Sequence, residues 1–350
     1  MVTIKDVAKK CNVSIATVSN ILSGKPNASE ETRKRVLEAV QELNYIPNYV
    51  AKNLKMKSTK TIGVIVEDIT VFCAPDIIDG ITQYCEEEGY NILLTNLRLY
   101  KKYSDLYYHN DKIKIHVNQE IKKLLSKQVD GIIYVPAHER VLKCLPENLT
   151  VPIAIAYGYS KSAKIPSVVV NEIEGGYKIA SCVMEQGHTK IGIITGKEDS
   201  LHARDRLMGY QKAMYEHGVL YNPDYVVSGD WTREGGYGAT CELLEKDITA
   251  IMCMNDIMAA GVYDRLEEVG LTPGQDISVV GYDNRELASF FRPALTTVEL
   301  PLFEMGRKAC KCVIDLIRQE ETAKNEEKAE YTELEVTGQV LIRHSIKKVN

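Results

Sequence analysis

The sequence lacks the features of membrane, secreted and zinc-binding chains. Among its 350 residues, no uninterrupted apolar run approaches the ~20 residues that a membrane-spanning helix needs. The segment Met1–Lys10 is polar and charged, and no apolar stretch with a cleavage site follows it, which argues against secretion. The nine cysteines form no C-x-x-C pair, and Cys310 and Cys312 lie too close together to suggest a zinc ribbon. We therefore expect a cytoplasmic protein with reduced thiols and no bound metal.

Catalytic motifs are also missing. The sequence has no G-x-S-x-G and no H-E-x-x-H, and its seven histidines are dispersed. The segment Gly192–Lys197 resembles a phosphate loop only superficially, because its spacing is one residue short and Glu198 stands where a Ser or Thr would hold magnesium. These absences favour a protein that is not an enzyme and uses no cofactor.

Positive charge is concentrated near the N-terminus. Residues 1–60 contain eleven Lys and Arg against five Asp and Glu, a net charge of +6, so the other residues carry −11 and the whole chain −5. A basic head on an acidic body fits a chain of which only the head meets a polyanion. A solvated helical surface that is basic by chance explains the charge equally well.

The first 45 residues have helical periodicity and no strand signal. Thr3, Ser14 and Ser29 are suitable caps for three helices, the first over about residues 4–11. In the second helix, Val18 shares one face with the apolar residues Ile21 and Leu22. Two short helices joined by a tight turn and braced by a third describe a helix-turn-helix, whose second helix lies in the major groove of DNA. A small helical cap without a ligand is the competing interpretation.

The second helix has an outward side that suits DNA. With its apolar face turned inward, Ile15, Ala16, Ser19 and Asn20 point outward. Asn20 is the side chain among them that reads an adenine edge with two hydrogen bonds, whereas Ile15 and Ala16 offer apolar contacts. Hydroxyls and lysines suit phosphate contacts. The predicted DNA-binding residues of the head are Thr3, Lys5, Ser14, Ile15, Ala16, Thr17, Ser19, Asn20 and Asn27.

From residue 61 onward, short β-rich runs alternate with helical stretches. We predict strands at Ile62–Val66, Ile92–Thr95, Gly131–Val135, Val151–Tyr157, Ser167–Val170, Ile191–Thr195, Ala250–Met254 and Ile277–Tyr282. We predict helices over 75–89, 117–128, 172–187, 203–218, 233–246 and 255–270. Apolar strands that alternate with helices indicate parallel sheets covered on both faces. Eight or more strands in about 290 residues favour two α/β lobes.

Three motifs of the head carry a resemblance to a known family. They are the segments Thr3–Ala8, Val13–Ser19 and Leu43–Asn48. Together they resemble, almost without gaps over residues 1–60, the head of the LacI/GalR family of bacterial repressors. The resemblance implies a homodimer that binds a pseudo-palindromic double-stranded DNA operator, with one head on each half-site. It also implies a hinge helix that inserts Leu54 into the minor groove. Further DNA contacts expected there are Asn48, Ala51 and Lys55.

The body resembles the core of the same family, which is similar to periplasmic sugar-binding proteins. The matching blocks include Gly187–Gly192, Ala203–Tyr210, Asn255–Ala259 and Gly281–Asn284. The resemblance implies an α/β core of two lobes with a small effector, a sugar, bound between them. The implied domains are a helix-turn-helix head (1–46), a hinge and linker (47–60), an N-terminal lobe (61–163 and 293–325) and a C-terminal lobe (164–292 and 326–350). The implied effector contacts are Phe72, Asn171, Arg206, Trp231, Asn255 and Asp283.

Several alternatives stay open. Arg206 has Asp205 and Glu234 as possible ion-pair partners, and a lone Trp such as Trp231 is more often part of a core. The long segment Asn96–Asn118 either covers the effector site or packs on a partner subunit. A purine or another metabolite could replace the sugar, and the resemblance is compatible with both induction and co-repression. A solute-binding protein without sequence-specific DNA reading, and an enzyme tethered to DNA, are the rival functions.

Overall fold

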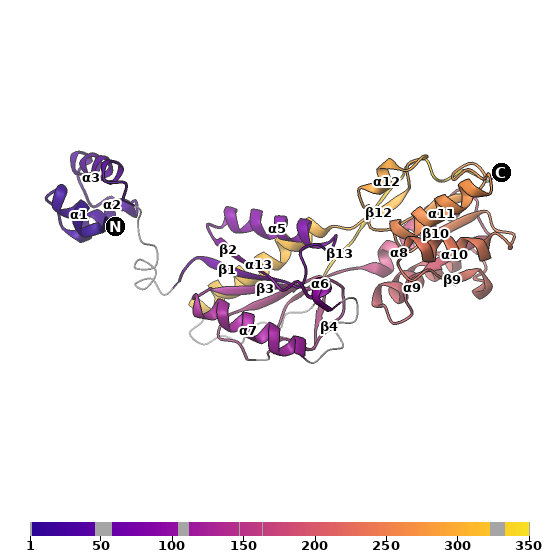
Figure 1. Cartoon of the computed structure of the whole chain (residues 1–350), viewed down its shortest axis with the longest axis horizontal. Helices are drawn as coiled ribbons and strands as arrows, with labels where there is room; N and C mark the ends of the chain where they lie inside the picture. Colours follow the sequence, from indigo (N-terminus) through magenta and orange to yellow (C-terminus); the bar gives the residue numbers. More distant parts are fainter. Residues whose placement is uncertain are drawn as a thin grey trace. The chain divides into compact units, whose positions relative to one another are not determined.

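The computed structural model of the chain describes residues 2–45, 58–103, 112–146, 148–162, 164–322 and 333–349. Two compact units, Met1–Thr59 and Lys60–Asn350, make up the chain (Figure 1). The first is helical and the second contains parallel sheets, so the predicted fold class is confirmed. No helix in these ranges has both the length and the apolar character that a membrane span requires.

The first unit is a small three-helix bundle. Its helices are α1 (Ile4–Lys10), α2 (Ile15–Leu22) and α3 (Glu30–Glu42). Val7, Val18 and Val36, one from each helix, are fully buried in its core. The caps form as predicted at two helices: Ser14 Oγ accepts the N–H of Thr17 at 3.0 Å, and Ser29 Oγ accepts that of Thr32 at 3.3 Å. These bonds satisfy amides that the first helical turn leaves unpaired.

The first sheet of the second unit has six parallel strands. They are β1 (Thr61–Val66), β2 (Asn91–Asn96), β3 (Gly131–Val135), β5 (Ile153–Ala156), β7 (Ser167–Val170) and β13 (Leu334–Val336), in the spatial order β13-β7-β5-β3-β1-β2. The helices of this lobe are α5 (Ala74–Glu87), α6 (Leu99–Tyr103), α7 (Lys112–Ser126) and α13 (Leu302–Thr322).

Both faces of the six-stranded sheet are buried, because successive strand residues point to opposite sides. Val64 and Ile133 lie in one hydrophobic cluster with residues of α5 and α13. Ile65 and Tyr134, the next residues along, lie in a second cluster with residues of α7. Figure 1 shows α5 and α7 on opposite sides of the strands. This burial explains why the strands read as continuous apolar runs.

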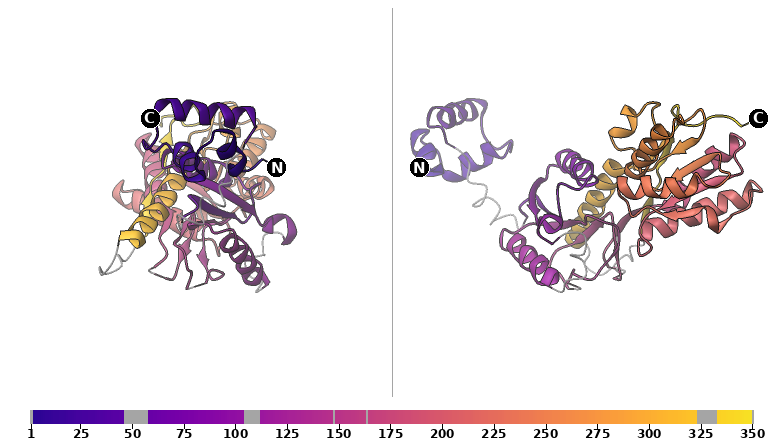
Figure 2. Two further views of the ribbon diagram at one scale, coloured as in Figure 1. Left: turned by 90° about the vertical axis from the view of Figure 1, so that its left-hand side faces the viewer. Right: turned by 45° about the vertical axis from the view of Figure 1, so that its right-hand side comes forward.

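The second sheet has four parallel strands and its own helices. Its strands are β8 (Ile191–Thr195), β9 (Val226–Ser228), β10 (Ala250–Cys253) and β11 (Ser278–Val280), in the order β11-β10-β8-β9. Its helices are α8 (Glu172–Glu185), α9 (Leu201–Glu216), α10 (Arg233–Leu243), α11 (Asp256–Glu268) and α12 (Leu287–Phe290), with a short 3-10 helix, η2 (Pro223–Tyr225). Helices flank both sheets in Figure 2 as well, and the prediction of two α/β lobes is confirmed.

Two pairs of short strands complete the unit. Strand β4 (Val141–Leu142) pairs in parallel with β6 (Tyr159–Ser160), and β12 (Thr297–Glu299) pairs antiparallel with β14 (Gln339–Leu341). Helix α13 and strands β9, β12, β13 and β14 were not predicted from the sequence. Helix α13 ends at Thr322, and residues 323–332 lie outside the described ranges.

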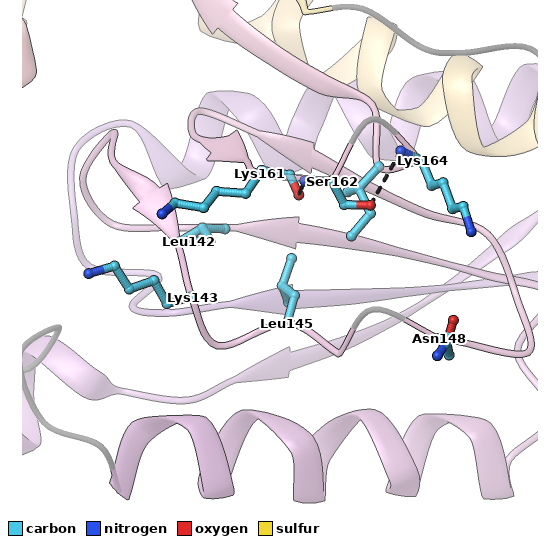
Figure 3. Close-up of a pocket in the computed structure, with 9 residues that line it drawn as sticks. Leu142, Lys143, Leu145, Asn148, Lys161, Ser162 and Lys164 are labelled. Atoms are coloured by element: carbon cyan, nitrogen blue, oxygen red, sulfur yellow. Dashed lines mark hydrogen bonds between the residues drawn. The ribbon is translucent and has the colours of Figure 1, made fainter.

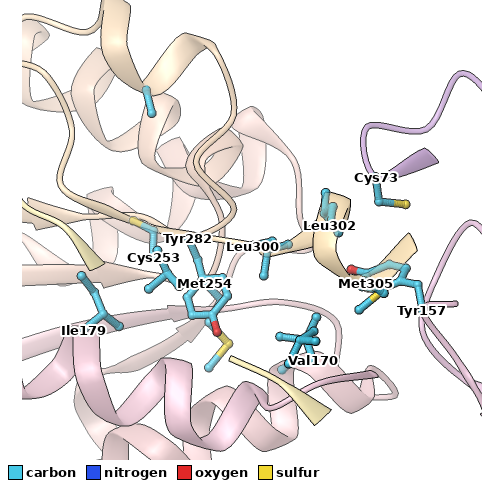
Figure 4. Packing of buried hydrophobic residues seen from close by; sticks show 14 of the residues in the cluster. Cys73, Tyr157, Val170, Ile179, Cys253, Met254, Tyr282, Leu300, Leu302 and Met305 are labelled. Atoms are coloured by element: carbon cyan, nitrogen blue, oxygen red, sulfur yellow. The ribbon is translucent and has the colours of Figure 1, made fainter. Parts of the chain in front are cut away.

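The chain changes lobes later than the expected boundaries. Strand β7 lies beyond residue 163 but pairs with β5 of the first sheet, so the chain leaves that lobe after Val170. It returns between Glu299 and Leu302, not at 292, and leaves again after Val336, not at 325. The pairing of β7 with β5 decides to which lobe β7 belongs, and this pairing cannot be read from the sequence. Figure 4 shows Leu300 and Met305 among the buried side chains near these crossings.

Helices α8 and α9 approach each other through a pair of glycines. A Cβ atom on Gly176 would lie 2.6 Å from the carbonyl oxygen of Arg206, and one on Gly209 would lie 2.2 Å from that of Ile173. Backbone atoms cannot move aside as a side-chain end can. The two glycines therefore fix the distance between the helix that carries Arg206 and the helix that begins at Glu172.

We expect Gly209→Ala to lower the free energy of unfolding by about 1–3 kcal/mol, because the added methyl group overpacks the α8–α9 contact. Gly238→Ala is a matched control, since Gly238 also lies within a helix and a Cβ there would meet nothing within 4 Å. The free energy of unfolding of Gly238→Ala should be equal to or higher than that of the wild type. Urea unfolding measures both variants; equal midpoints would contradict the close approach.

Candidate functional site

The exposed side of α2 is the first candidate surface. Ile15, Ala16 and Ser19 are exposed, with Ile15 at 44% of its full accessibility, and Asn20 is half-buried. Val18 and Ile21 are buried at 0% and 3% exposure. The predicted orientation of the helix is thus confirmed: its apolar face holds it in the head, and its other face presents apolar and amide side chains together.

The other residues of the head that were predicted to contact DNA precede, belong to or follow α2 in the sequence. Thr3, Lys5, Ser14 and Asn27 are exposed, and Thr17 is half-buried. The N–H and the hydroxyl of Thr3 both donate to Asp6 Oδ2 at 2.8 Å. These bonds lower the pKa of the Asp6 carboxyl. The four predicted hinge contacts lie outside the described residues: Asn48, Ala51, Leu54 and Lys55.

A buried ionic cluster in the second unit is the second candidate site. Its centre is Arg206 of α9, whose side chain is 3% exposed. Arg206 Nε donates to Glu172 Oε2 at 2.9 Å and Nη2 to Glu172 Oε1 at 2.8 Å, a two-point pair. Nη1 donates to the carbonyl oxygen of Met254. The guanidinium lies 3.7 Å from the ring centroid of Tyr282. The ion pairs of Arg206 among the described residues are with Glu172 and Asp283, so neither Asp205 nor Glu234 is its partner, and Asp205 pairs with Arg204.

His202 extends the cluster toward the first lobe. It lies one helical turn before Arg206, and its Nδ1 is 2.7 Å from Glu172 Oε1. Its Nε2 is 3.3 Å from the hydroxyl of Tyr157, the residue that follows β5. Burial lowers the pKa of His202, but the hydrogen bond to Glu172 and the carboxylate of Glu139 outweigh this effect, so the pKa is raised. His202 therefore contacts Glu172 of the second lobe and Tyr157 of the first.

Asp283 and Asn255 bring two more predicted residues to Arg206. Asp283 Oδ1 lies 3.5 Å from Arg206 Nη2, and its side chain is 7% exposed. Burial raises its pKa to about 6, although Arg206 acts in the opposite direction. Asn255 caps α11: its Oδ1 accepts the N–H of Met258 at 2.7 Å, and its Nδ2 donates to the carbonyl oxygen of Trp231 at 3.2 Å. Both residues follow the carboxyl ends of strands, where ligands bind in parallel sheets.

Trp231 is partly buried beside the same arginine. Its ring centroid is 5.8 Å from the guanidinium carbon of Arg206. A Cβ on Gly196 would lie 1.9 Å from the indole, so the backbone at Gly196 lies directly against the ring. Trp231 packs on the hydrophobic core but keeps some exposed surface. This geometry allows Trp231 both roles that the sequence left open: a core residue and a surface on which a ligand can stack.

Glu139 brings a buried carboxylate to this region. The residue is 4% exposed, and its Oε1 has no hydrogen-bond partner among the described residues. Its Oε2 is 3.5 Å from the N–H of Val170. Burial raises the pKa of Glu139 to about 7, and His202 counteracts part of that increase. A buried oxygen without a partner costs free energy, so it marks a place where a ligand with a donor group would be stabilised.

The raised pKa of Glu139 predicts a pH effect on stability. Between its unfolded pKa of about 4.3 and its folded pKa of about 7, the folded state binds the proton that the unfolded state has lost. Stability should therefore fall as the pH rises through this window, by up to about 1.4 kcal/mol per pH unit. Glu139→Gln should reduce this fall by the contribution of Glu139, whereas the contribution of Asp283, whose pKa is also raised, remains. The same charge change at exposed Glu185 should leave the fall unchanged. Parallel pH profiles of wild type and Glu139→Gln in urea unfolding would contradict the burial argument.

The structure brings together four of the six predicted effector contacts, Arg206, Trp231, Asn255 and Asp283. The two others have neighbours of their own. Phe72 lies 4.9 Å below the guanidinium of Arg285, and Asn171 caps α8 and donates to Glu335 Oε2 at 2.5 Å. Glu172, His202 and Glu139 were not predicted from the sequence. His202 stands four residues before Arg206, and this helical spacing was an available signal.

Known proteins similar to this chain are regulators of transcription. Residues 3–48 match the family model of bacterial regulatory proteins of the lacI family, and residues 181–346 match a periplasmic binding protein-like domain. A relative from Vibrio campbellii, the HTH-type transcriptional repressor PurR, is 33% identical over 355 residues, with all of both chains covered. PurR of Haemophilus influenzae is also 33% identical, over 353 residues and the full length of both.

The chain belongs to the lacI family of bacterial regulatory proteins. Solved structures agree with this assignment. The lac repressor bound to ONPG in the repressed state is 26% identical with a TM-score of 0.77, covering 98% of this chain and 99% of that one. A CelR–cellobiose complex is 25% identical with a TM-score of 0.65, covering 99% and 100%. The relatives and fold neighbours are DNA-binding repressors and not enzymes, and this protein is a transcriptional repressor of that family.

Proposed function

We propose that this repressor acts as a homodimer that reads a pseudo-palindromic operator with the exposed side of α2. The observation that carries the proposal is the division of α2 into a buried face and a face that presents Ile15, Ala16, Ser19 and Asn20. A helix held in this way presents base-reading side chains to the major groove. The net charge of +6 on residues 1–60 favours binding to phosphates. Residues 47–60 are proposed as the hinge that adds minor-groove contacts.

The proposed effector is a sugar that binds at the Arg206 cluster. Asp283 and the unpartnered Oε1 of Glu139 are acceptors for hydroxyl groups, and the exposed part of Trp231 is a platform for a pyranose face. The donors of Arg206 are already engaged by Glu172 and Met254. Arg206 therefore contributes mainly by holding the acceptors in place, and a ligand reaches its guanidinium only by displacing one of them.

A purine is the second candidate effector. Relatives named PurR match the full length of this chain at 32–34% identity, whereas solved family members with bound cellobiose or ribose support the sugar. A planar base would use Trp231 and the carboxylates as stacking partner and acceptors. The acceptor-rich chemistry at Asp283 and Glu139 favours the polyhydroxylated ligand.

Ligand-induced shifts of the melting temperature distinguish these candidates. We expect one or more pentoses or hexoses to raise the melting temperature of the wild type, and Asp283→Asn to abolish the shift because it removes a charged acceptor. A shift with hypoxanthine or guanine alone would replace the sugar by the purine. Sugar shifts that persist in Asp283→Asn would remove this residue from the site. Since ligand and operator affinities are linked, the active compound must also change operator affinity.

A further inference from the structure

A pocket of the first lobe has the composition of an anion site. It has a volume of about 500 Å3 and is lined by Leu142, Lys143, Leu145, Asn148, Ser160, Lys161, Ser162, Lys164 and Ile165. Figure 3 shows these side chains around the pair of short strands β4 and β6 and the loops that follow them. A volume of this size accommodates a small organic ligand. The pocket shares no residue with the Arg206 cluster.

The charged side chains that line the pocket are all lysines. Lys143, Lys161 and Lys164 are exposed, and none of them forms an ion pair with a described residue. No carboxylate is among the lining residues. The only acidic residue in the sequence from 142 to 165 is Glu147, which lies outside the described residues. An anion bound in the pocket would be attracted by these three ammonium groups.

The two serine hydroxyl groups of the pocket accept hydrogen bonds from the backbone. Ser160 Oγ accepts the N–H of Ser162 at 3.0 Å, and Ser162 Oγ is 3.4 Å from the N–H of Lys164. Because each oxygen is used as an acceptor, its own O–H remains to donate to a ligand. The side-chain amide of Asn148 adds a further donor group. Lysine ammonium and serine hydroxyl groups are typical phosphate contacts.

The floor of the pocket is apolar. Leu142 and Ile165 are 6% and 7% exposed and belong to the hydrophobic cluster between the first sheet and α7, on which Leu145 packs. A free inorganic ion would leave this floor unused, whereas an organic phosphate places its carbon skeleton on the floor and its charge at the rim. We propose that this pocket binds a small phosphorylated metabolite, independently of the effector site.

Isothermal titration of the full chain with glucose 6-phosphate, inorganic phosphate and glucose tests the proposal. We expect glucose 6-phosphate to bind more tightly than inorganic phosphate, with an affinity that falls as salt is added. The triple variant Lys143→Gln, Lys161→Gln and Lys164→Gln should weaken glucose 6-phosphate binding by about tenfold or more, because three ion pairs are lost. The matched control changes three exposed lysines on and next to α7, Lys114, Lys122 and Lys127, to Gln.

Each outcome decides the proposal. A loss of affinity confined to the pocket variant supports it. An equal loss in both triple variants shows a general effect of net charge and overturns it. Unchanged affinity in the pocket variant places glucose 6-phosphate elsewhere, for example at the Arg206 cluster, and also overturns it. The proposal is also overturned if glucose binds as tightly as glucose 6-phosphate and the pocket variant weakens the binding of both equally.

Discussion

Arg206→Met should lower the free energy of unfolding by about 3–5 kcal/mol, because it leaves the carboxylate of Glu172 buried with too little compensation. Glu172 is 1% exposed and has two hydrogen bonds from this guanidinium. Burial alone raises the pKa of Glu172, but Arg206 and His202 more than reverse that effect and lower it. The carboxylate is therefore charged at neutral pH, and its contribution to stability is lost only in acid, as the pH falls through its folded pKa.

A double-mutant cycle separates the pair from the rest of the cluster. Glu172→Gln should cost less than Arg206→Met, because Asp283 remains 3.5 Å from the arginine. The double variant should cost less than the sum of the two single variants, with a coupling of about 2 kcal/mol. Arg233→Met is the matched control: its pair with Asp264 is similar in geometry but exposed, so we expect a loss below about 1 kcal/mol. Urea unfolding at pH 7 measures all four variants. Equal losses for Arg206→Met and Arg233→Met would contradict the role of burial.

Asn20→Ala should reduce discrimination at one base pair of each half-site by about 1–3 kcal/mol, the cost of losing a two-point contact to a base edge. Lys5→Ala provides the contrast. Its exposed ammonium group contacts phosphate in the proposed complex, so its loss should weaken all sequences alike and reduce the salt dependence by about one ion.

Affinities for a set of operators with single substitutions, measured at two salt concentrations, distinguish these two effects. The side chain of Asn20 is half-buried on α2, so thermal unfolding of the variant provides the necessary check that the head remains folded. A uniform loss of affinity for Asn20→Ala, with discrimination unchanged, would show that Asn20 contacts the backbone and not a base.

The helices and strands that could be predicted from the sequence are those marked by a local pattern of apolar and capping residues. Strand β3 is apolar throughout because both of its faces are buried, and α2 is predictable because Ser14 and the period of Val18 and Ile21 agree. Strand β13 is three residues long, and α13 follows the proline Pro301 without a strong cap signal. Their places depend on pairing with β7 and packing on α5, which are contacts between distant parts of the chain.

The candidate site was predictable in part for the same reason. Arg206, Asn255 and Asp283 stand in motifs that resemble a known family. Glu172 and Glu139 belong to none of those motifs. Glu172 reaches Arg206 and His202 only when α8 packs on α9, and Glu139 comes near His202 only when the two lobes have folded. A buried carboxylate also looks, in the sequence, like any exposed one. These two carboxylates could therefore be assigned to the site only from the fold.

The most direct test is the binding of the full chain to DNA with and without its effector. Fluorescence anisotropy compares a labelled fragment from upstream of the repressor's own gene with a scrambled duplex of equal length and composition. We expect the genomic fragment to bind at least about 1,000-fold more tightly, and the sugar that raises the melting temperature to change that affinity while leaving the scrambled duplex unaffected. Equal affinity for both duplexes, insensitive to every metabolite, would contradict the account.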